Sequence, residues 1–270
     1  MEKSNIGEKI KLLTGSGMWH TREAEGLPSV HLSDGPHGLR KQEEKERQNN
    51  VSLVSTCYPT ASALACSWDV TAAERLGRAV AKEAWNADVA VLLGPGINMK
   101  RSPLCGRNFE YFSEDPFLAG RLGAAYVSAA QGENVAVSLK HFAANNQETN
   151  RQTSNSQIDE RALREIYLSA FEYVVKTARP ATVMASYNRL NGYYACENRH
   201  LLTEILREEW GFDGVVISDW GACADLAKAV KAGMDLEMPD SHGIHARKLK
   251  AALKAGEISE EDIAKAAGRI

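Results

Sequence analysis

Short apolar segments rich in β-branched residues alternate along this chain with segments whose apolar residues recur at helical spacing. Such alternation is typical of repeated βα units around a parallel sheet. The segments expected to form strands are residues 30–32, 88–93, 135–139, 181–186, 214–218 and 236–238. We therefore predict one α/β domain over residues 1–270, a (β/α)8 TIM-like barrel with irregular or missing elements. Because alternation does not reveal whether the sheet closes, a doubly wound open sheet is the structural alternative.

Several helical segments carry recognisable end signals. Thr71 and Glu74 fit a capping box that opens a helix running to residue 84, and Ser259 with Asp262 fits a similar start near the end of the chain. Gly211 stands where a left-handed C-cap is expected, after an apolar stripe formed by Leu201, Leu202, Ile205 and Leu206. A second apolar stripe, which should pack on the sheet, is formed by Leu163, Ile166, Tyr167, Ala170, Phe171 and Val174. Residues 41–50 and 147–157 are polar and without periodicity, so both are predicted to be loops.

The composition excludes several classes of partner. A net charge of -3 provides no basic face for nucleic acid, so an uncharged small ligand fits better. Residues 1–7 lack the apolar core of a signal peptide, and no stretch approaches the roughly 18 to 20 apolar residues that span a bilayer. We therefore expect a cytoplasmic location, with neither nucleic acid nor a membrane as partner.

The metal-ligating residue types show no recognisable spacing. The five cysteines contain no C-x-x-C pair, and the histidines show no H-E-x-x-H pattern. Both a disulfide framework and a zinc site are therefore disfavoured, and the cysteines are expected to be ordinary small apolar residues. Gly94 and Gly96 match the first two glycines of a dinucleotide-binding motif, but the third glycine of that motif is replaced by Met99. The sequence therefore predicts neither a metal nor a cofactor.

Polar residues follow four of the expected strands, at the point where a barrel places its chemistry. They are Asp34, Lys140 with His141, Tyr187, and Asp219 with Trp220. Carboxylates and cations can bind hydroxyl groups, while an aromatic face covers the apolar side of a sugar ring. Together these residues suit an uncharged polyol such as a sugar.

Each of these residues also has an ordinary structural explanation. Asp34 precedes a Gly-Pro turn, and Asp219 is well placed to cap the following helix. A lone His141 more often bonds a buried backbone group, and Trp220 is by default a core residue. Lys140 is harder to explain in this way, because an ammonium group buried at the end of an apolar strand is costly without a carboxylate or ligand. The coincidence of four strand ends favours a site.

Longer motifs make the sequence resemble a known family. They are LSDGPHGLR at 32–40, GPGIN at 94–98, GRNFE at 106–110, SEDP at 113–116, KHF at 140–142 and GVVISDW at 214–220. In these motifs, and over nearly the whole chain, the sequence resembles glycoside hydrolase family 3, particularly its β-glucosidases. The resemblance implies a retaining β-glycosidase that hydrolyses terminal non-reducing β-D-glucosyl residues through a covalent glycosyl-aspartate, with Asp219 as the nucleophile.

The same resemblance implies a set of sugar-binding residues in the subsite being cleaved. They are Asp34, Arg107, Lys140, His141, Arg151, Tyr187, and the apolar walls Met184 and Trp220. Glu110 and Glu148 are expected to orient Arg107 and Lys140 rather than to react. The substrate is then a β-glucoside or oligosaccharide.

A retaining glycosidase needs a second carboxyl group about 5 to 5.5 Å from the nucleophile. In the β-glucosidases that the chain resembles, this acid/base is a glutamate of a following α/β sandwich domain. Members that cleave N-acetylglucosaminides instead use a histidine loop announced by KHFPG, but here KHF is followed by Ala143 and Ala144. We therefore expect a complementing domain or partner, or self-association through the uncovered rim.

Three functional alternatives stay open from the sequence. The first is a β-xylosidase or a mixed-specificity β-glycosidase, because no motif fixes recognition of the exocyclic CH₂OH group. The second is a sugar-binding barrel fragment with little or no turnover, because the acid/base glutamate is not among these residues. The third is a Schiff-base barrel such as an aldolase, suggested only by Lys140 at a strand end.

Overall fold

The core of the fold is a parallel five-stranded sheet with helices packed along it. The computed structural model describes residues 5–24, 26–35, 37–42 and 51–270. The strands, in sheet order, are β1 (Leu32–Asp34), β2 (Val91–Leu93), β3 (Ala136–Phe142), β5 (Thr182–Ala185) and β8 (Val215–Ser218). Because sheet order follows chain order without a reversal, each βα unit extends the same edge, as in a barrel wall and unlike a doubly wound sheet.

Single bridges continue this sheet where ladders end. Leu236 pairs in parallel with Ile217, and Glu237 with Thr14, so the expected strand at 236–238 is present only as isolated bridges. At the other edge His20 pairs with His31 in antiparallel fashion. In the described part of the chain, no continuous ladder closes the barrel.

Two strand boundaries differ from the prediction in a way that matters for function. Asp34 is the last residue of β1, and both Lys140 and His141 lie inside β3 rather than in a following loop. The prediction ended the strands where polar side chains begin. That assumption is wrong here because these polar side chains find buried partners, so the strand can continue through them.

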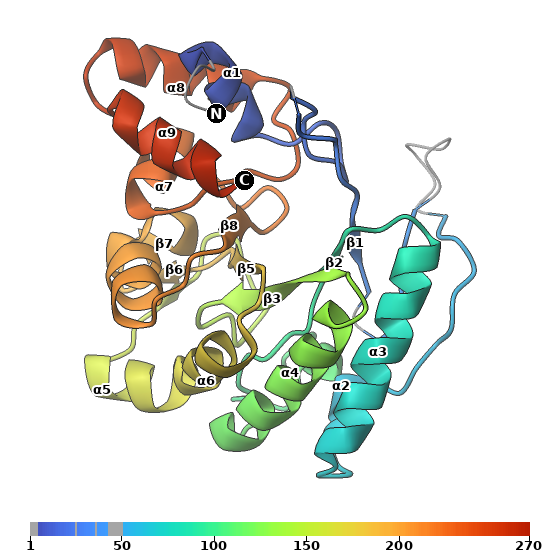
Figure 1. Cartoon of the computed structure of the whole chain (residues 1–270). Helices are drawn as coiled ribbons and strands as arrows, with labels where there is room; N and C mark the ends of the chain where they lie inside the picture. Colours follow the sequence, from blue (N-terminus) through green and yellow to red (C-terminus); the bar gives the residue numbers. More distant parts are fainter. Residues whose placement is uncertain (1–4, 25, 36, 43–50) are drawn as a thin grey trace.

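Helices connect the strands and cover the sheet. The longer ones are α3 (Val70–Asn86), α4 (Pro116–Gln131), α6 (Ser169–Ala178), η4 (His200–Glu209), α8 (Ile244–Lys254) and α9 (Glu260–Arg269). The short ones are α1 (Ile6–Leu12), α2 (Ala61–Ala65), η1 (Asn108–Glu110), α5 (Glu160–Ala162), η2 (Leu163–Tyr167), η3 (Ala195–Glu197) and α7 (Leu226–Ala232). In Figure 1, α3, α4 and α6 lie side by side along one flank, whereas α1 packs with α8 and α9 at the opposite end of the molecule.

The helix signals were predicted with mixed success. The capping box of Ser259 and Asp262 is confirmed at the start of α9, and Gly211 adopts the expected left-handed conformation, with φ of 71°. The box proposed for Thr71 is wrong. Asp69 is the N-cap of α3, and its carboxylate accepts both the N–H and the hydroxyl of Thr71 at 2.8 and 2.6 Å. The helix therefore begins two residues earlier than the sequence pattern suggested, and the threonine hydroxyl is bonded to the N-cap residue.

One predicted apolar stripe is only partly buried. Leu163 and Phe171 belong to the core, but Ile166 is exposed. The segment Leu163–Tyr167 forms wide π-type turns, which rotate side chains away from the positions that α-helical spacing assigns to them. The stripe at 201–206 is fully buried as expected, although η4 is also of the wide type.

One of the two predicted loops contains a strand of a small second sheet. Within 147–157, Asn155–Ser156 form β4, which pairs with β6 (Arg189–Leu190), and β6 pairs with β7 (Tyr193–Tyr194). Most of the loop predicted at 41–50 lies outside the described residues. Among the helices that are described, none combines the length and apolar character needed to cross a bilayer.

Side chains on the inner face of the sheet position the site. They form a separate apolar cluster of Leu32, Val91, Leu93, Met184, Ile217, Leu236 and Met238, with Trp19 and Trp220 packed against it. The larger core lies between the sheet and its helices. This apolar cluster fills the space on the inner face of the sheet, and the polar residues lie next to it at the carboxyl ends of the strands.

Candidate active site

A buried lysine lies between two carboxylates at the centre of the site. Lys140 is only 3% exposed, and its Nζ lies 2.8 Å from Asp34 Oδ1 and 3.5 Å from Glu110 Oε2. Burial alone would lower the pKa of Lys140, but the carboxylates of Asp34 and Glu110 raise it above its ordinary value. Burial likewise acts to raise the pKa of Asp34, and Lys140 more than offsets this, so the pKa of Asp34 is lowered. The lysine and Asp34 therefore remain charged.

A second cation links Glu110 to the imidazole of His141. Arg107 donates from Nε to Glu110 Oε1 at 2.5 Å, and its Nη2 lies 2.7 Å from His141 Nε2. Burial and the neighbouring cations Arg107 and Lys140 hold the pKa of His141 well below its ordinary value. His141 is thus neutral, and because Nε2 accepts from Arg107, its proton lies on Nδ1.

Two residues hold His141 in this orientation. The hydroxyl of Tyr111 lies 2.9 Å from His141 Nδ1, within reach of the ring proton. Asn98 accepts the backbone N–H of His141 at 2.7 Å and donates to its carbonyl at 2.8 Å. The side chain and the backbone of this strand residue are therefore both fixed.

Asp219 has one carboxylate oxygen without a partner. It follows β8, is 7% exposed, and accepts the N–H of Trp220 through Oδ1 at 2.7 Å. Its Oδ2 is buried without a hydrogen-bond partner among the described residues and lies 3.7 Å from His141 Nε2. Burial raises the pKa of Asp219, against the opposing effect of Arg107 and Lys140. The alternative role as a helix cap is wrong, because α7 begins at Leu226 and is capped by Asp225.

Aromatic side chains form one side of this site. The indole of Trp220 packs against Trp19 with ring centroids 5.2 Å apart and ring planes tilted by 35°, and it donates to the carbonyl of Met18 at 2.8 Å. Tyr187 donates its hydroxyl to the carbonyl of Trp220 at 2.9 Å. The guanidinium of Arg151 lies 4.5 Å from the centre of the Tyr187 ring. These aromatic side chains therefore contact the loop that carries Asp219, since Trp220 directly follows Asp219 in the chain.

The predicted residues therefore fall into two connected groups. Salt bridges and short hydrogen bonds connect Asp34, Glu110, Arg107, Lys140 and His141, with Asp219 beside them. A cation–π contact joins Arg151 to Tyr187, and a hydrogen bond joins Tyr187 to Trp220. Trp220 packs against the apolar cluster that contains the buried Met184. Glu110 bonds both of the cations that it was expected to orient. Glu148 bonds Arg151 at 2.9 Å and Asn145 at 3.1 Å instead.

Sequence reasoning missed Tyr111, Asn98, Asn145 and Trp19. Tyr111 directly follows the GRNFE motif, and Asn98 ends the GPGIN motif, so a polar residue next to a motif was an available signal. Trp19 offered no such signal, because the loop that it contacts is about 200 residues away in the chain.

Comparison with known proteins identifies the family. A family model described as glycosyl hydrolase family 3 N terminal domain matches residues 36–270. The chain belongs to this family. It is 52% identical to thermostable beta-glucosidase B of Acetivibrio thermocellus, over 100% of this chain and 36% of that protein. It is 50% identical to an exo-alpha-(1->6)-L-arabinopyranosidase of Bifidobacterium longum, over 88% of this chain and 32% of that protein.

Solved structures match this family 3 domain over its whole length. The structure of beta-glucosidase 3B from Thermotoga neapolitana in complex with glucose aligns with a TM-score of 0.94 and 39% identity, covering 100% of this chain and 41% of that one. A beta-glucosidase of Bifidobacterium adolescentis gives 0.92 and 45%, over 99% and 38%. The predicted barrel-type α/β fold is confirmed. The chain spans about a third of the length of the curated relatives it matches.

Proposed function

We propose that this family 3 domain is the catalytic barrel of a retaining β-glycosidase that removes terminal non-reducing β-D-glucosyl residues. The observation that carries the proposal is the free Oδ2 of Asp219, buried beside Arg107 and Lys140 at the carboxyl end of the sheet. The printed names of relatives such as the Acetivibrio thermocellus beta-glucosidase support the substrate class. The chain covers only about a third of the length of such relatives. The activity of the whole protein is therefore also proposed.

In this mechanism Asp219 attacks the anomeric carbon and forms a glycosyl-aspartate, which water then hydrolyses. The nucleophile must be ionised, and Arg107 and Lys140 favour its charged form against the cost of burial. Asp34, Lys140 and Arg107 present charged groups to the sugar hydroxyls, which fixes the ring for attack. Trp220 covers an apolar face of the sugar.

The general acid/base is proposed to come from outside the described residues. A general acid at neutral pH needs a raised pKa, whereas the pKa of Asp34 is lowered. Glu110 is bonded to both Arg107 and Lys140, and Glu148 is bonded to Arg151. A complementing domain or a partner would supply the acid. The chain alone should then cleave aryl β-glucosides with good leaving groups much faster than cellobiose, and efficient cleavage of cellobiose would refute this assignment.

The surface that would meet this domain lies beside Arg107. Leu104, in the loop before η1, is 91% exposed, and Phe109, in η1 directly after this loop, is 41% exposed, an unusual exposure for large apolar side chains so close together. We propose that this loop contacts the acid/base domain and drives self-association when that domain is absent. Light scattering of the chain alone should show oligomers that dissociate in the Leu104→Asn variant. A monomer at high protein concentration would argue against the contact.

Trapping of the covalent intermediate tests the proposed nucleophile. Incubation with an activated 2-deoxy-2-fluoro-β-glucoside, followed by peptide mass spectrometry, should place one fluoroglucosyl group on Asp219. The Asp219→Asn variant should remain unlabelled, while Asp213→Asn, at an exposed aspartate nearby in sequence, should label like the wild-type chain. Absence of label would favour a sugar-binding barrel without turnover, and label on another carboxylate would reassign the nucleophile.

A second candidate substrate class is a pentopyranoside. The relative from Bifidobacterium longum, at 50% identity, is named as an arabinopyranosidase, and a pentopyranose lacks the exocyclic CH₂OH of glucose. A β-xyloside shares this lack. Values of kcat/KM decide between the classes when they are measured on aryl β-glucoside, aryl β-xyloside and aryl α-L-arabinopyranoside. A pocket that binds the CH₂OH group should favour the glucoside by about tenfold or more, roughly the contribution of one well-packed group.

A further inference from the structure

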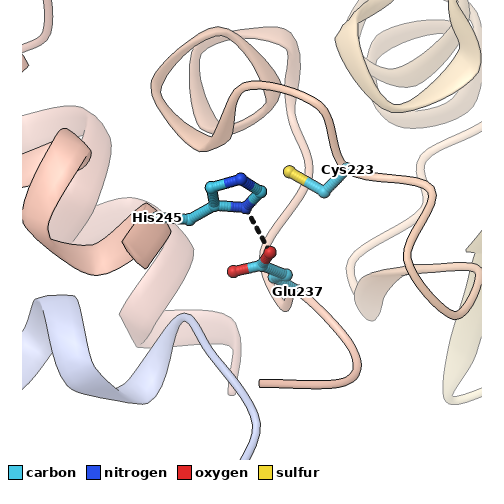
Figure 2. A group of neighbouring side chains, drawn as sticks. All are labelled: Cys223, Glu237 and His245. Carbon is cyan, nitrogen blue, oxygen red and sulfur yellow. Dashed lines mark hydrogen bonds and ion pairs between the residues drawn. The ribbon is translucent and has the colours of Figure 1, made fainter. Parts of the chain in front are cut away.

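Three side chains of metal-ligating type meet outside the candidate active site. Cys223 lies in the loop between β8 and α7, Glu237 in the segment after α7, and His245 in the first turn of α8. Figure 2 shows the thiol, the carboxylate and the imidazole turned toward one another. One ligand atom from each residue lies within 4.8 Å of the other two. His245 Nδ1 and Glu237 Oε1 are in hydrogen-bond contact.

We propose that Cys223, Glu237 and His245 bind one divalent ion of the zinc class. Zinc accepts sulfur, nitrogen and carboxylate oxygen at about 2.0 to 2.3 Å, and three protein ligands leave a fourth position for water. Ligand atoms around such an ion lie roughly 3 to 4 Å apart in tetrahedral geometry, so donors already within 4.8 Å need only small shifts. Calcium and magnesium are poor candidates, because they prefer sets made of oxygen alone.

The surroundings hold two of these ligands in place. Ser241 donates its hydroxyl to Glu237 Oε2 at 3.4 Å and accepts the backbone N–H of His245 at 3.1 Å. The backbone of Glu237 donates to the carbonyl of Leu13 at 2.9 Å and accepts from Gly15 at 3.0 Å. A ligand that is fixed by neighbouring hydrogen bonds loses less freedom when it binds an ion.

Binding has a definite proton balance. The Cys223 thiol is buried, and a metal takes it as the thiolate, so one proton passes to solvent. The ion also replaces the proton shared between His245 and Glu237, which the imidazole can carry on its other nitrogen. No oxidant or reductant is needed.

The position of this cluster relates it to the loop that carries Asp219. Leu236 and Met238 point into the inner apolar cluster, so Glu237 between them points to the opposite face, toward the helices. Gly221 donates to the carbonyl of Met238 at 2.8 Å, and Ala222 donates to the carbonyl of Asp219 at 2.9 Å. An ion on Cys223 would therefore tie this loop to the start of α8 without touching the sugar-binding side chains.

Cobalt absorption tests the site without relying on activity. Titration of the metal-stripped chain with Co²⁺ should produce a thiolate-to-cobalt charge-transfer band, and Zn²⁺ should abolish it by competition. The band should disappear in Cys223→Ser. His245→Asn should weaken Co²⁺ binding by about tenfold or more, since loss even of a residue that only orients a ligand costs roughly that much. Cys57→Ser, at an exposed cysteine, and His242→Asn, at an exposed histidine, are matched controls that should bind like the wild-type chain.

Thermal unfolding provides an independent measurement. At a Zn²⁺ concentration of about a hundred times Kd, the Tm of the wild-type chain should rise by roughly 5 °C. The Tm of Cys223→Ser and of His245→Asn should not change with Zn²⁺. A charge-transfer band that persists in Cys223→Ser, or a wild-type chain that shows neither the band nor the Tm shift, would overturn the assignment. Should Cys223→Ser fail to fold, the spectra and Tm of His245→Asn against His242→Asn decide it.

Discussion

Lys140 Nζ lies 2.8 Å from Asp34 Oδ1, although 106 residues separate the two in the chain. The contact joins the carboxyl ends of β1 and β3, with β2 between them in the sheet. Glu110 adds a second carboxylate at 3.5 Å, and Arg107 adds a second cation on the far side of Glu110. Charges of opposite sign thus alternate around the site, and each one depends on its neighbours for compensation.

Replacing Lys140 by methionine should destabilise the chain. Removal of one member of a buried charge group leaves Asp34 and Glu110 uncompensated, so the free energy of unfolding at pH 7 should fall by about 3 kcal/mol. Urea denaturation measures this change. Lys176→Met, which removes an exposed partner of Glu172 on α6, should cost less than about 1 kcal/mol. Equal losses in the two variants would contradict the buried ion pair.

The same pair predicts a pH dependence. The folded-state pKa of Asp34 lies below its ordinary value of 3.8, so its stabilising contribution is present above pH 3.8 and is lost as the pH falls through the folded-state pKa. In Lys140→Met this acid-side loss should be smaller, because the main cause of the lowered pKa is gone. Tm measured between neutral and strongly acidic pH in both proteins tests the difference.

Asp219→Asn should raise stability while it removes the proposed nucleophile. Burial raises the folded-state pKa of Asp219 above 3.8, so the carboxylate costs folding free energy as the pH rises above 3.8, and the full cost is present above the folded-state pKa. The amide carries no charge, so the free energy of unfolding should rise by about 0.5 to 2 kcal/mol at pH 7. A gain of this size is typical when a destabilising functional residue is replaced. The gain should vanish below pH 3.8, where both side chains are neutral. A variant less stable than the wild-type chain at pH 7 would contradict the cost of burial.

The sequence predicts those residues of the site that lie at the ends of strands. Alternating apolar segments located the sheet, and the carboxyl ends of parallel strands share one edge, which is why Asp34, Lys140 and Asp219 could be grouped. The partners of these residues could not be derived in the same way. Glu148 bonds Arg151 because of how its loop folds, and no periodicity describes that loop.

Other features escaped prediction for related physical reasons. The π-type turns at 163–167 depart from the spacing of an α-helix, so the helical pattern misplaced Ile166. The contact of Trp19 with Trp220 joins segments at opposite ends of the chain. Cys223, Glu237 and His245 come from two loops and a helix start, and their irregular spacing along the chain could not show that they lie together.

Tyr111→Phe should impair both folding and catalysis. It removes the hydroxyl that partners His141 Nδ1 and leaves a buried N–H without an acceptor, at a cost of about 1 to 3 kcal/mol. If His141 then turns, Arg107 loses its contact as well, so kcat/KM on an aryl β-glucoside should fall by about tenfold, equivalent to 1.4 kcal/mol. Tyr126→Phe is the matched control, since Tyr126 is also buried and shows no side-chain hydrogen bond in the described part of the chain. Similar values for the two variants would show that Tyr111 does not hold His141.

Gly96→Ala should disturb the same tyrosine from the other side. A Cβ at position 96 would lie 2.9 Å from Cδ1 of Tyr111 and 3.2 Å from the carbonyl of Glu110, closer than packed side chains tolerate. The expected cost is about 1 to 3 kcal/mol of unfolding free energy, because a buried ring that already supports His141 must move. Gly94→Ala is the matched control, since its Cβ would meet nothing within 4 Å, and its cost should stay within about 0.5 kcal/mol. Urea denaturation of the two variants side by side measures the difference. Gly96→Ala should also share the reduced kcat/KM of Tyr111→Phe, and normal activity in a destabilised Gly96→Ala would mean that the ring can move without releasing His141.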